Sequence, residues 1–522
     1  MATLTKKTTS TNVVQQALAG TGKTTTNVWA LTKIPDGITL SDEQAAIIEA
    51  VRSEKSKTRR FTAFSKRIAT ELQSRLGSSA EACTNHSLGF SCIRKKAGRT
   101  KVDSRKYFRV CESLFGIVNE MTTQKAKSAA IAEYREITAL SDIVRSTLTG
   151  DISSSQKAGH WIVTPDEVAQ TAAMYSINYE KQSSLEQACE VVKAGSKNLN
   201  IVDFTDMIAQ PACHDLAPDK VDLGLVDEAQ DMNTAQQWLA TRSADRLVIV
   251  GDDNQSIFGW AGADPESMLR LHNQLGETHR GVITLPLTET RRCAKSIVAV
   301  AQQFVPQFRA HTSNIEGLVT DCKASDLVDI LGKDSSEKVD VAVLCRTNAP
   351  LARLGLQLLR AEIPVAVKSG NFAKTIKSIV KKLDCGDITE FRNNLDTYLQ
   401  IELDKIAKWK SPNADQVRSL IEDRCDTILV LSEGCSTVAC ISQKIDRLFD
   451  DTPDRRKIPL SSVHSAKGLE WDKVIIHKPD LLPHPKISEK NAFNAAQERN
   501  LAYVGFTRAK RELIFARDSK EV

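Results

Sequence analysis

A glycine-rich turn after the first apolar run of the chain restricts what its N-terminal part can fold into. Residues 12–14 (NVV) predict a strand, and residues 19–24 (AGTGKT) predict a turn that opens a helix. Glycines there let backbone N–H groups approach a phosphate, and the helix N-terminus adds a favourable dipole. Lys23 would contact the β- and γ-phosphates of a nucleotide, and the Thr24 hydroxyl would bind Mg²⁺. Ala17 stands where the strict pattern has glycine, so a chance glycine turn stays open at this point.

Acidic residues follow a second apolar run at a point where a sheet would end. Residues 223–226 (LGLV) predict a buried strand, and Asp227 and Glu228 come directly after it. A carboxylate at that position can hold Mg²⁺, and a second can polarise an attacking water. Gln255 follows a further strand and could sense the γ-phosphate or orient that water. The alternatives are a solvated acidic loop for the two carboxylates and a helix-capping polar cluster for Gln255.

The distribution of short β-branched runs predicts an α/β fold with two lobes. Four runs precede position 280 and three follow it, and longer stretches of helical period separate them. Two mainly helical stretches interrupt the pattern. We therefore expect two α/β lobes with parallel sheets, each carrying a mainly helical insertion. The expected bounds are 1–87 and 199–280 for the first domain, 88–198 for its insertion, 281–372 and 456–522 for the second domain, and 373–455 for a reduced second insertion.

Chain length, net charge and cysteine content are consistent with these expectations but do not establish them. A chain of 522 residues is too long for one core, and its formal charge of +5 permits nucleic-acid binding without arguing for it. No run of apolar residues is long enough for a membrane span, and the N-terminus has no secretory core. The twelve cysteines form no Cys-x-x-Cys pair, so reduced thiols in a cytosolic protein are the favoured interpretation.

Aromatic and basic residues lie close to the predicted nucleotide motifs. Phe64 follows a predicted strand and precedes Lys66, and Phe258 and Trp260 follow Gln255 closely. Such residues form the stacking platforms of single-strand binders, although core packing is the alternative for each aromatic ring. Residues 94–109 hold eight basic side chains and one acidic one. They are either a backbone-binding patch or a solvated basic face.

At this point the chain resembles the UvrD/Rep-type superfamily 1 DNA helicases, in a short branch similar to the phage-encoded and F-box-helicase members. The resemblance spans most of the chain and rests on ordered motifs. In this family Ala often occupies the first position of the phosphate loop, as Ala17 does here. The matched segments are residues 19–24, 63–69, 84–89, 203–208, 226–231, 251–260, 287–292, 463–471 and 498–509.

The resemblance implies two RecA-like lobes, ATP with Mg²⁺ between them, and single-stranded DNA crossing both lobes in 3′→5′ movement. It makes Asp227 a Mg²⁺ ligand together with Thr24, and Glu228 the catalytic base. Positive charge at the γ-phosphate would come from Arg292 and Arg508, with Gln255 completing the catalytic set. The implied nucleotide-binding residues are Ala19, Gly20, Thr21, Gly22, Lys23, Thr24, Thr25, Gly468 and Glu470, and the implied DNA-binding residues are Phe64, Lys66, His86, Phe258, Trp260 and His464.

The chain departs from the family pattern in three places. Arg291 stands where the family usually has an aromatic residue that stacks on adenine; a guanidinium can also stack on a base. The adenine-reading glutamine normally lies upstream of the phosphate loop, where this chain offers Gln15 and Gln16, whereas the closest matching segment, ending in Gln44, lies downstream. The second insertion is about half the usual length.

The sequence thus predicts an ATP-dependent DNA helicase or translocase that hydrolyses ATP in response to DNA. The expected partners are single-stranded DNA and single-strand/duplex junctions, with single-strand-binding, replication or repair proteins as further candidates, and no membrane. The expected location is the cytoplasm of a bacterium or phage-infected cell, or the nucleus in a eukaryote. Two alternatives stay open: a translocase that displaces proteins with little unwinding, and a nucleotide-gated DNA-binding protein.

Overall fold

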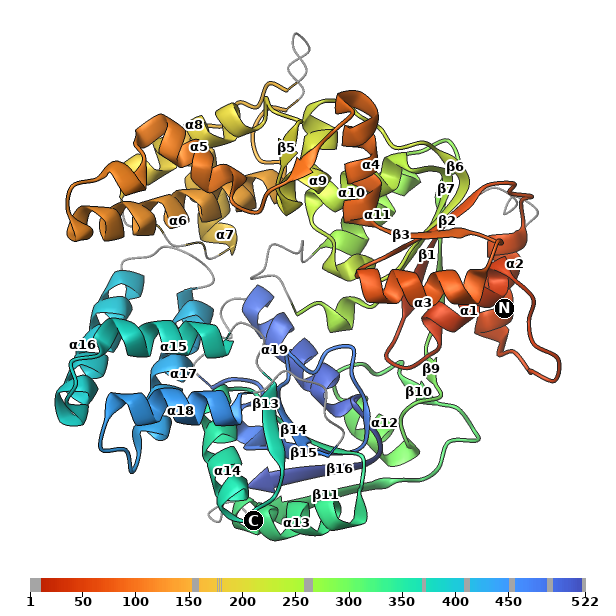
Figure 1. Ribbon diagram of the computed structural model, residues 1–522. Coiled ribbons are helices and arrows are strands. Elements are labelled where there is room, and N and C mark those ends of the chain that lie inside the picture. Colours follow the sequence, from red (N-terminus) through yellow and green to blue (C-terminus); the bar gives the residue numbers. More distant parts are fainter. Residues whose placement is uncertain are drawn as a thin grey trace. The chain divides into compact units, whose positions relative to one another are not determined.

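The computed structural model describes residues 11–152, 159–175, 177, 179, 181–257, 266–368, 372–407, 414–449, 456–485 and 492–518. The chain divides into two compact units (Figure 1). The first comprises Met1–Ala17 and Gly22–Leu287, and the second comprises Leu18–Thr21 and Thr288–Val522. Each unit contains a six-stranded sheet in which all neighbouring strands run parallel. The predicted α/β class with two parallel sheets is confirmed.

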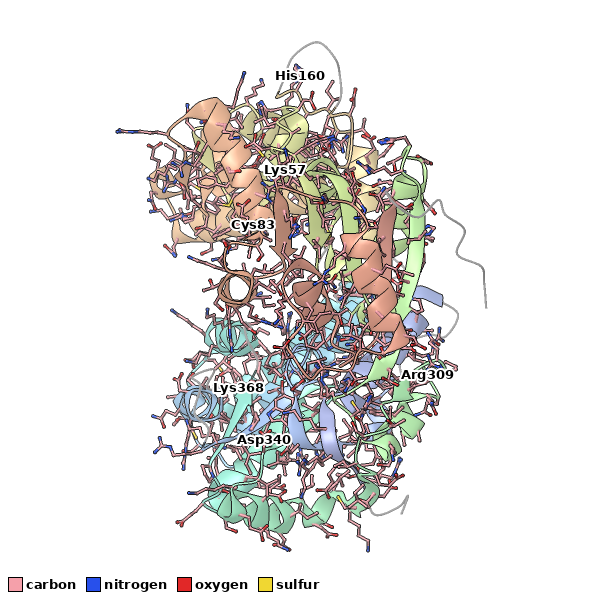
Figure 2. All side chains as sticks on the ribbon, turned by 90° about the vertical axis from the view of Figure 1, so that its right-hand side faces the viewer. Lys57, Cys83, His160, Arg309, Asp340 and Lys368 are labelled. Carbon is pink, nitrogen blue, oxygen red and sulfur yellow. The ribbon has the colours of Figure 1, made fainter. Side chains whose placement is uncertain are left out.

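The sheet of the first unit has the strand order β3-β2-β6-β7-β1-β8. In that order the strands are β3 (Glu81–Thr84), β2 (Arg59–Ala63), β6 (Val221–Val226), β7 (Ala244–Gly251), β1 (Asn12–Ala17) and β8 (Val282–Leu287). Lys57 precedes β2 and Cys83 lies within β3; both are labelled in Figure 2. All four strands predicted for this lobe are present, and β3 and β8 extend the sheet at its two edges.

Helices cover both faces of this sheet because successive strand side chains point in opposite directions. Val13 packs in one buried cluster with α1 (Lys23–Leu31), α2 (Asp42–Arg52) and α3 (Lys66–Leu76). Its neighbour Val14 packs in a second cluster with α10 (Thr234–Arg242) and α11 (Ser267–Gly276). The helix starts are capped locally: Ser65 accepts a hydrogen bond from Ile68 N at the start of α3.

The helical insertion of the first unit lies between β3 and β6. It contains α4 (Asn85–Ala97), β4 (Lys101–Val102), α5 (Lys106–Phe115), the 3₁₀ helix η1 (Val118–Glu120), α6 (Gln124–Ser146), α7 (Pro165–Tyr175), α8 (Gln182–Gly195), β5 (Ile201–Val202) and α9 (Phe204–Cys213). Its core includes Ile137 and Val191 and continues to Leu239 of α10. The insertion therefore shares buried side chains with the sheet-bearing part of the first unit.

The sheet of the second unit has the order β11-β16-β15-β12-β14-β13. These strands are β11 (Leu318–Lys323), β16 (Ala509–Arg517), β15 (Trp471–His477), β12 (Val341–Cys345), β14 (Ile458–Ser462) and β13 (Val365–Lys368). They include the three strands predicted for this lobe. A separate two-stranded pair, β9 (Glu289–Thr290) with β10 (Arg309–Ala310), lies near the start of the unit.

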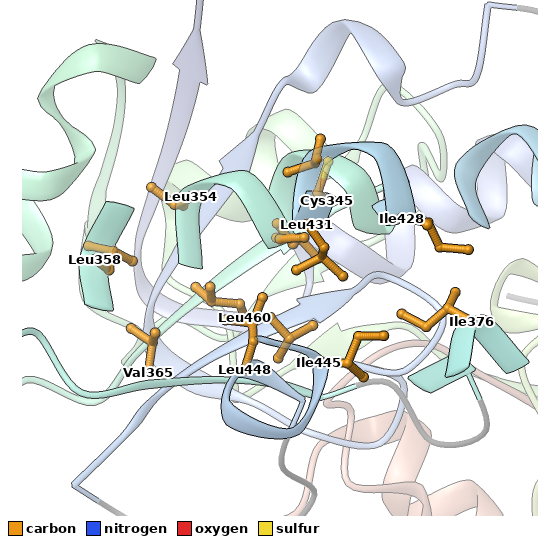
Figure 3. Close-up of a cluster of buried hydrophobic side chains, with 14 of the residues drawn as sticks. Cys345, Leu354, Leu358, Val365, Ile376, Ile428, Leu431, Ile445, Leu448 and Leu460 are labelled. Carbon is orange, nitrogen blue, oxygen red and sulfur yellow. The ribbon is translucent and has the colours of Figure 1, made fainter. Parts of the chain in front are cut away.

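The helices of the second unit share one core with its sheet. Around the strands lie α12 (Lys295–Ala301), α13 (Leu327–Glu337), α14 (Asn348–Arg360) and α19 (Ala492–Phe506). The reduced insertion supplies α15 (Phe372–Leu383), α16 (Ile388–Ala407), α17 (Ala414–Ser432) and α18 (Val438–Leu448). Leu431 and Ile445 from the insertion pack with Leu460 of the sheet in one buried cluster (Figure 3). No helix within the described ranges has the length and apolar character of a membrane span.

Candidate nucleotide and nucleic-acid sites

The phosphate loop and the acidic strand end meet in the first unit. Gly22 adopts a left-handed conformation with φ 78°, and α1 begins at the next residue, Lys23. Lys23 Nζ lies 2.8 Å from Glu228 Oε1, and Thr24 Oγ1 donates a hydrogen bond of 2.9 Å to Asp227 Oδ2. The structure thus brings together the two halves of the predicted nucleotide site, although they lie about two hundred residues apart in the sequence.

The charges in this cluster depend on one another. Burial alone would lower the pKa of Lys23, but Glu228 and Asp227 outweigh burial and raise it. Burial and the charge of Glu228 raise the pKa of Asp227. The Thr24 hydroxyl and the Asp227 carboxylate are adjacent oxygen donors, the kind that Mg²⁺ prefers. These residues therefore fit a Mg²⁺ ion and suit anionic phosphate.

A network of side-chain amides orders the loops behind the acidic residues. Glu228 has φ 53°, a left-handed conformation that is uncommon for a non-glycine residue. Gln230 Nε2 donates to Glu228 Oε2 at 2.6 Å, and Gln230 Oε1 accepts from Asp252 N at 3.1 Å. Gln255 Nε2 in turn donates to Asp252 Oδ2 at 2.6 Å. Gln255 is thus connected to Glu228 through two intervening residues.

Two predicted arginines lie close together in the second unit. Arg292 Nε lies 2.6 Å from Glu470 Oε2, and the buried Arg508 donates to the backbone oxygens of Val504 at 2.9 Å and Leu469 at 3.2 Å. Burial and the charge of Arg292 lower the pKa of Arg508 to about 10. Two guanidinium groups near one carboxylate leave an excess of positive charge, which suits an anionic ligand.

The first residues of the phosphate loop, Leu18–Thr21, belong to the second unit by their contacts. Ala19 N donates to the hydroxyl of Tyr503 at 3.0 Å, and Arg291 N donates to Gly20 O at 3.1 Å. A Cβ at Gly20 would lie 2.5 Å from Arg292 Cβ, so only glycine fits there. Gly468, also predicted at this site, has φ 83° and open space around it.

The candidate strand-binding side chains of the first unit differ in exposure, and His86 is half-buried. Phe64 is 50% exposed after β2, and the exposed Lys66 begins α3. His86 lies in the first turn of α4 and packs edge-to-face against Phe204, the first residue of α9, with ring centroids 6.5 Å apart. Phe204 is 61% exposed. The motif signal at residues 203–208 could have identified Phe204, but no role was predicted for it.

Three other nucleic-acid predictions have different outcomes. Phe258 and Trp260 lie outside the described residues. His464 is half-buried, and burial together with the nearby charge of Arg346 lowers its pKa to about 3, so its imidazole is neutral at pH 7. In the basic segment 94–109, the prediction of eight surface charges is wrong for Lys106, which is buried and ion-paired to Asp206 at 2.6 Å.

The glutamines considered for adenine recognition are separated by the fold. Gln15 is buried and exchanges hydrogen bonds with Asn27, and Gln16 donates to Asp253 Oδ2 at 3.1 Å. Gln44 completes a capping box at the start of α2 and donates to Thr26 Oγ1 at 3.2 Å. Its amide nitrogen is also the atom nearest to a Cβ built on Gly22. The Gln44 amide thus lies beside Gly22 of the phosphate loop.

Comparisons with known proteins agree with this arrangement. A family model described as the UvrD/REP helicase N-terminal domain matches residues 2–276, and one described as the UvrD-like helicase C-terminal domain matches residues 393–520. ATP-dependent DNA helicase UvrD2 of Mycobacterium tuberculosis is 24% identical, over 86% of this chain and 70% of that protein. Gabija protein GajB of Bacillus cereus is 27% identical, over 56% of this chain and 62% of that protein. ATP-dependent DNA helicase PcrA of Bacillus subtilis is 22% identical, over 70% of this chain and 64% of that protein.

Proposed function

The chain belongs to the UvrD/Rep family of ATP-dependent DNA helicases, and we propose that it moves 3′→5′ along single-stranded DNA and unwinds duplex ahead of it. The observation that carries the ATP hydrolysis in this proposal is the paired contact of Lys23 with Glu228 and of Thr24 with Asp227, and the direction rests on the resemblance to the family. These contacts join the phosphate loop, which follows β1, to two carboxylates that follow β6 of the same sheet. A phosphate-binding lysine together with such carboxylates is the residue set that phosphoryl transfer to water needs.

The first unit supplies the phosphate-binding and water-activating groups. Lys23 would bind the β- and γ-phosphates, with backbone N–H groups of residues 19–25 around them. Thr24 and Asp227 would hold Mg²⁺, which neutralises phosphate charge when bound. Glu228 would accept the proton of the attacking water, with Gln255 orienting that water. Entering phosphate competes with Glu228 for Lys23, so nucleotide binding would release this carboxylate for its role as base.

The second unit supplies positive charge. Arg292 and Arg508 would stabilise the negative charge that develops on the γ-phosphate. Backbone acceptors already fix the guanidinium of Arg508, so little reorganisation is needed when charge develops. Glu470 pairs with Arg292 and with Lys510, and we propose that it also contacts the ribose, beside Gly468.

Aromatic side chains of the first unit would bind the single-stranded DNA. Base stacking on Phe64, His86 and Phe204 is independent of sequence because every base has a π face, and Lys66 adds attraction to phosphate. Phe64 follows β2 and His86 follows β3, two neighbouring strands of the nucleotide-binding sheet, and Phe204 begins α9. Phe258, Trp260 and His464 stay predictions for the same role.

The direction of movement is tested with duplexes that carry a single-stranded tail on one 3′ end or one 5′ end. Unwinding is measured with ATP and Mg²⁺, and Lys23→Ala serves as the inactive control. We expect strand separation with the 3′ tail and little with the 5′ tail or a blunt duplex. Preferential unwinding from the 5′ tail would contradict the proposed direction.

A further inference from the structure

A cluster of charged side chains is buried inside the helical insertion, away from the nucleotide site. Arg145 on α6 and Asp206 on α9 have fully buried side chains, and Lys106 on α5 is nearly as buried. Tyr107 covers the cluster, with its ring 3.4 Å from the Arg145 guanidinium carbon. A Cβ at Gly195 would lie 2.5 Å from this ring, so a glycine on α8 is needed to admit it. Four helices of the insertion region thus meet at one ionic centre.

Arg145 makes the geometrically most demanding contacts of the cluster. Its Nη1 and Nη2 atoms donate to the two carboxylate oxygens of Asp203 at 2.8 and 2.9 Å, and Nη1 also donates to Asp206 Oδ1 at 2.8 Å. Burial alone would raise the pKa of Asp206, but Arg145 and Lys106 outweigh burial and lower it. A planar fork can hold Asp203 by two parallel hydrogen bonds and reach Asp206 as well, a geometry that a lysine ammonium does not reproduce.

The same carboxylates form the N-terminal cap of α9. Asp203 Oδ1 accepts from Asp206 N at 2.7 Å, and Asp206 completes the capping box. The first residue of the helix after this cap is Phe204, whose exposed ring packs against His86. The guanidinium of Arg145 therefore holds the side chain that caps the helix immediately before Phe204.

Stability alone gives little reason for such a cluster. Replacing a buried ion pair by well-packed apolar side chains is often neutral or stabilising, whereas a fork that fixes both carboxylates specifies one orientation. Resting on the proposed function, we propose that Arg145 is a positioning residue: it fixes the Asp203 cap so that Phe204 stands beside His86 in the orientation that stacks on a base of the bound strand. The helical insertion thereby sets the affinity for single-stranded DNA through a contact that Arg145 itself does not make.

The test is a double-mutant cycle on the affinity of the full-length protein for a fluorescent oligothymidylate. We expect Phe204→Ala and Arg145→Lys each to raise Kd about tenfold, the scale of one lost base–aromatic stack. If Arg145 acts through Phe204, the double variant has the Kd of Phe204→Ala alone, because the orientation of an absent ring has no effect. Fold-changes that multiply in the double variant, or an unchanged Kd in Arg145→Lys, would overturn the proposal.

Arg246→Lys is the matched control. Arg246 is 1% exposed in the same unit and donates to backbone oxygens of Thr11 and Val51, at the opposite end of β7 from the nucleotide motifs. We expect it to lower stability without changing Kd for the oligonucleotide. An equal loss of DNA affinity in Arg145→Lys and Arg246→Lys would show that replacing any buried arginine of this unit has this effect. That result would overturn the positioning role of Arg145.

A milder variant keeps the test decisive if Arg145→Lys does not fold. Tyr107→Phe removes the 3.0 Å hydrogen bond to Asp206 Oδ1 and keeps the ring on the guanidinium. We expect a two- to threefold rise in Kd that disappears in the Phe204→Ala background, on the scale of one weakened stack; persistence of the rise there would overturn the proposal. Failure of the unaltered protein to bind the oligonucleotide would instead overturn the proposed function, which separates the two claims.

Discussion

Replacing Gly89 by alanine tests how closely α4 and α9, the two helices that carry the proposed strand-binding residues His86 and Phe204, must pack. Gly89 lies in α4, and a Cβ there would lie 1.9 Å from the backbone oxygen of Met207 in α9 and 3.0 Å from Leu239 Cδ1. The Met207 oxygen belongs to the backbone, so it cannot rotate away as the end of a side chain could. Accommodating the methyl group therefore requires the helices to separate by an ångström or more.

The expected cost follows from this overlap. Overpacking a close-packed contact costs about 1–3 kcal/mol, and a backbone clash lies at the upper end of that range. The intrinsic gain of alanine over glycine in a helix offsets only about 0.5–1 kcal/mol. A net loss of about 2 kcal/mol should lower the Tm by roughly 4–8 °C for a unit of this size.

Thermal unfolding and oligothymidylate binding of Gly89→Ala are the measurements. We expect the lower Tm together with weaker strand binding, because α4 carries His86 and α9 carries Phe204. Gly276→Ala is the control: it lies in α11, and its nearest neighbour, Val282 Cγ1, lies at an ordinary 3.5 Å. A Gly89→Ala protein as stable as wild type would refute the packing argument.

Three further predictions concern nucleotide turnover and pH. Lys23→Ala should abolish ATP hydrolysis while leaving DNA binding measurable; a normal turnover rate in this variant would exclude the assigned phosphate site. Arg508→Ala should lower kcat by about 10³-fold or more with a smaller change in KM, and equal changes in both would assign Arg508 to ATP binding. Burial lowers the pKa of His477 to about 4, below the value of about 6.5 in the unfolded chain. The free energy of unfolding should therefore fall by up to about 3 kcal/mol as the pH falls from about 6.5 to 4, because only the unfolded state gains a proton in this range. His477→Gln should remove this part of the pH dependence. Denaturant titrations in which the variant keeps the same pH dependence as the wild type would contradict the prediction.

The nucleotide site was predictable from the sequence because its residues lie at strand ends and helix starts that short sequence patterns mark. An apolar run that ends abruptly in Asp227 and Glu228 places both carboxylates at the carboxyl end of a strand, and a glycine-rich turn before Lys23 places the lysine at a helix start. Parallel strands bring such ends to one edge of a sheet. The contacts Thr24–Asp227 and Lys23–Glu228 follow from those two patterns.

The ionic cluster in the insertion was not predictable by the same means. Arg145 contacts Asp203 and Asp206 across 58 and 61 positions of sequence, and no periodicity distinguishes these side chains from solvated ones. Lys106 was assigned to an exposed basic patch for this reason, because a charge run usually lies at the surface. Its burial depends on the carboxylate of Asp206 and the backbone oxygen of Asn198, which only the tertiary fold supplies.

The rate of ATP hydrolysis with and without single-stranded DNA, with single-stranded RNA as the control, tests the central claim most directly. A DNA motor that couples hydrolysis to movement should hydrolyse ATP much faster with single-stranded DNA, and RNA should have little effect. An ATPase rate that single-stranded DNA leaves unchanged, in a protein that still binds nucleotide, would contradict the account and favour a nucleotide-gated DNA-binding protein.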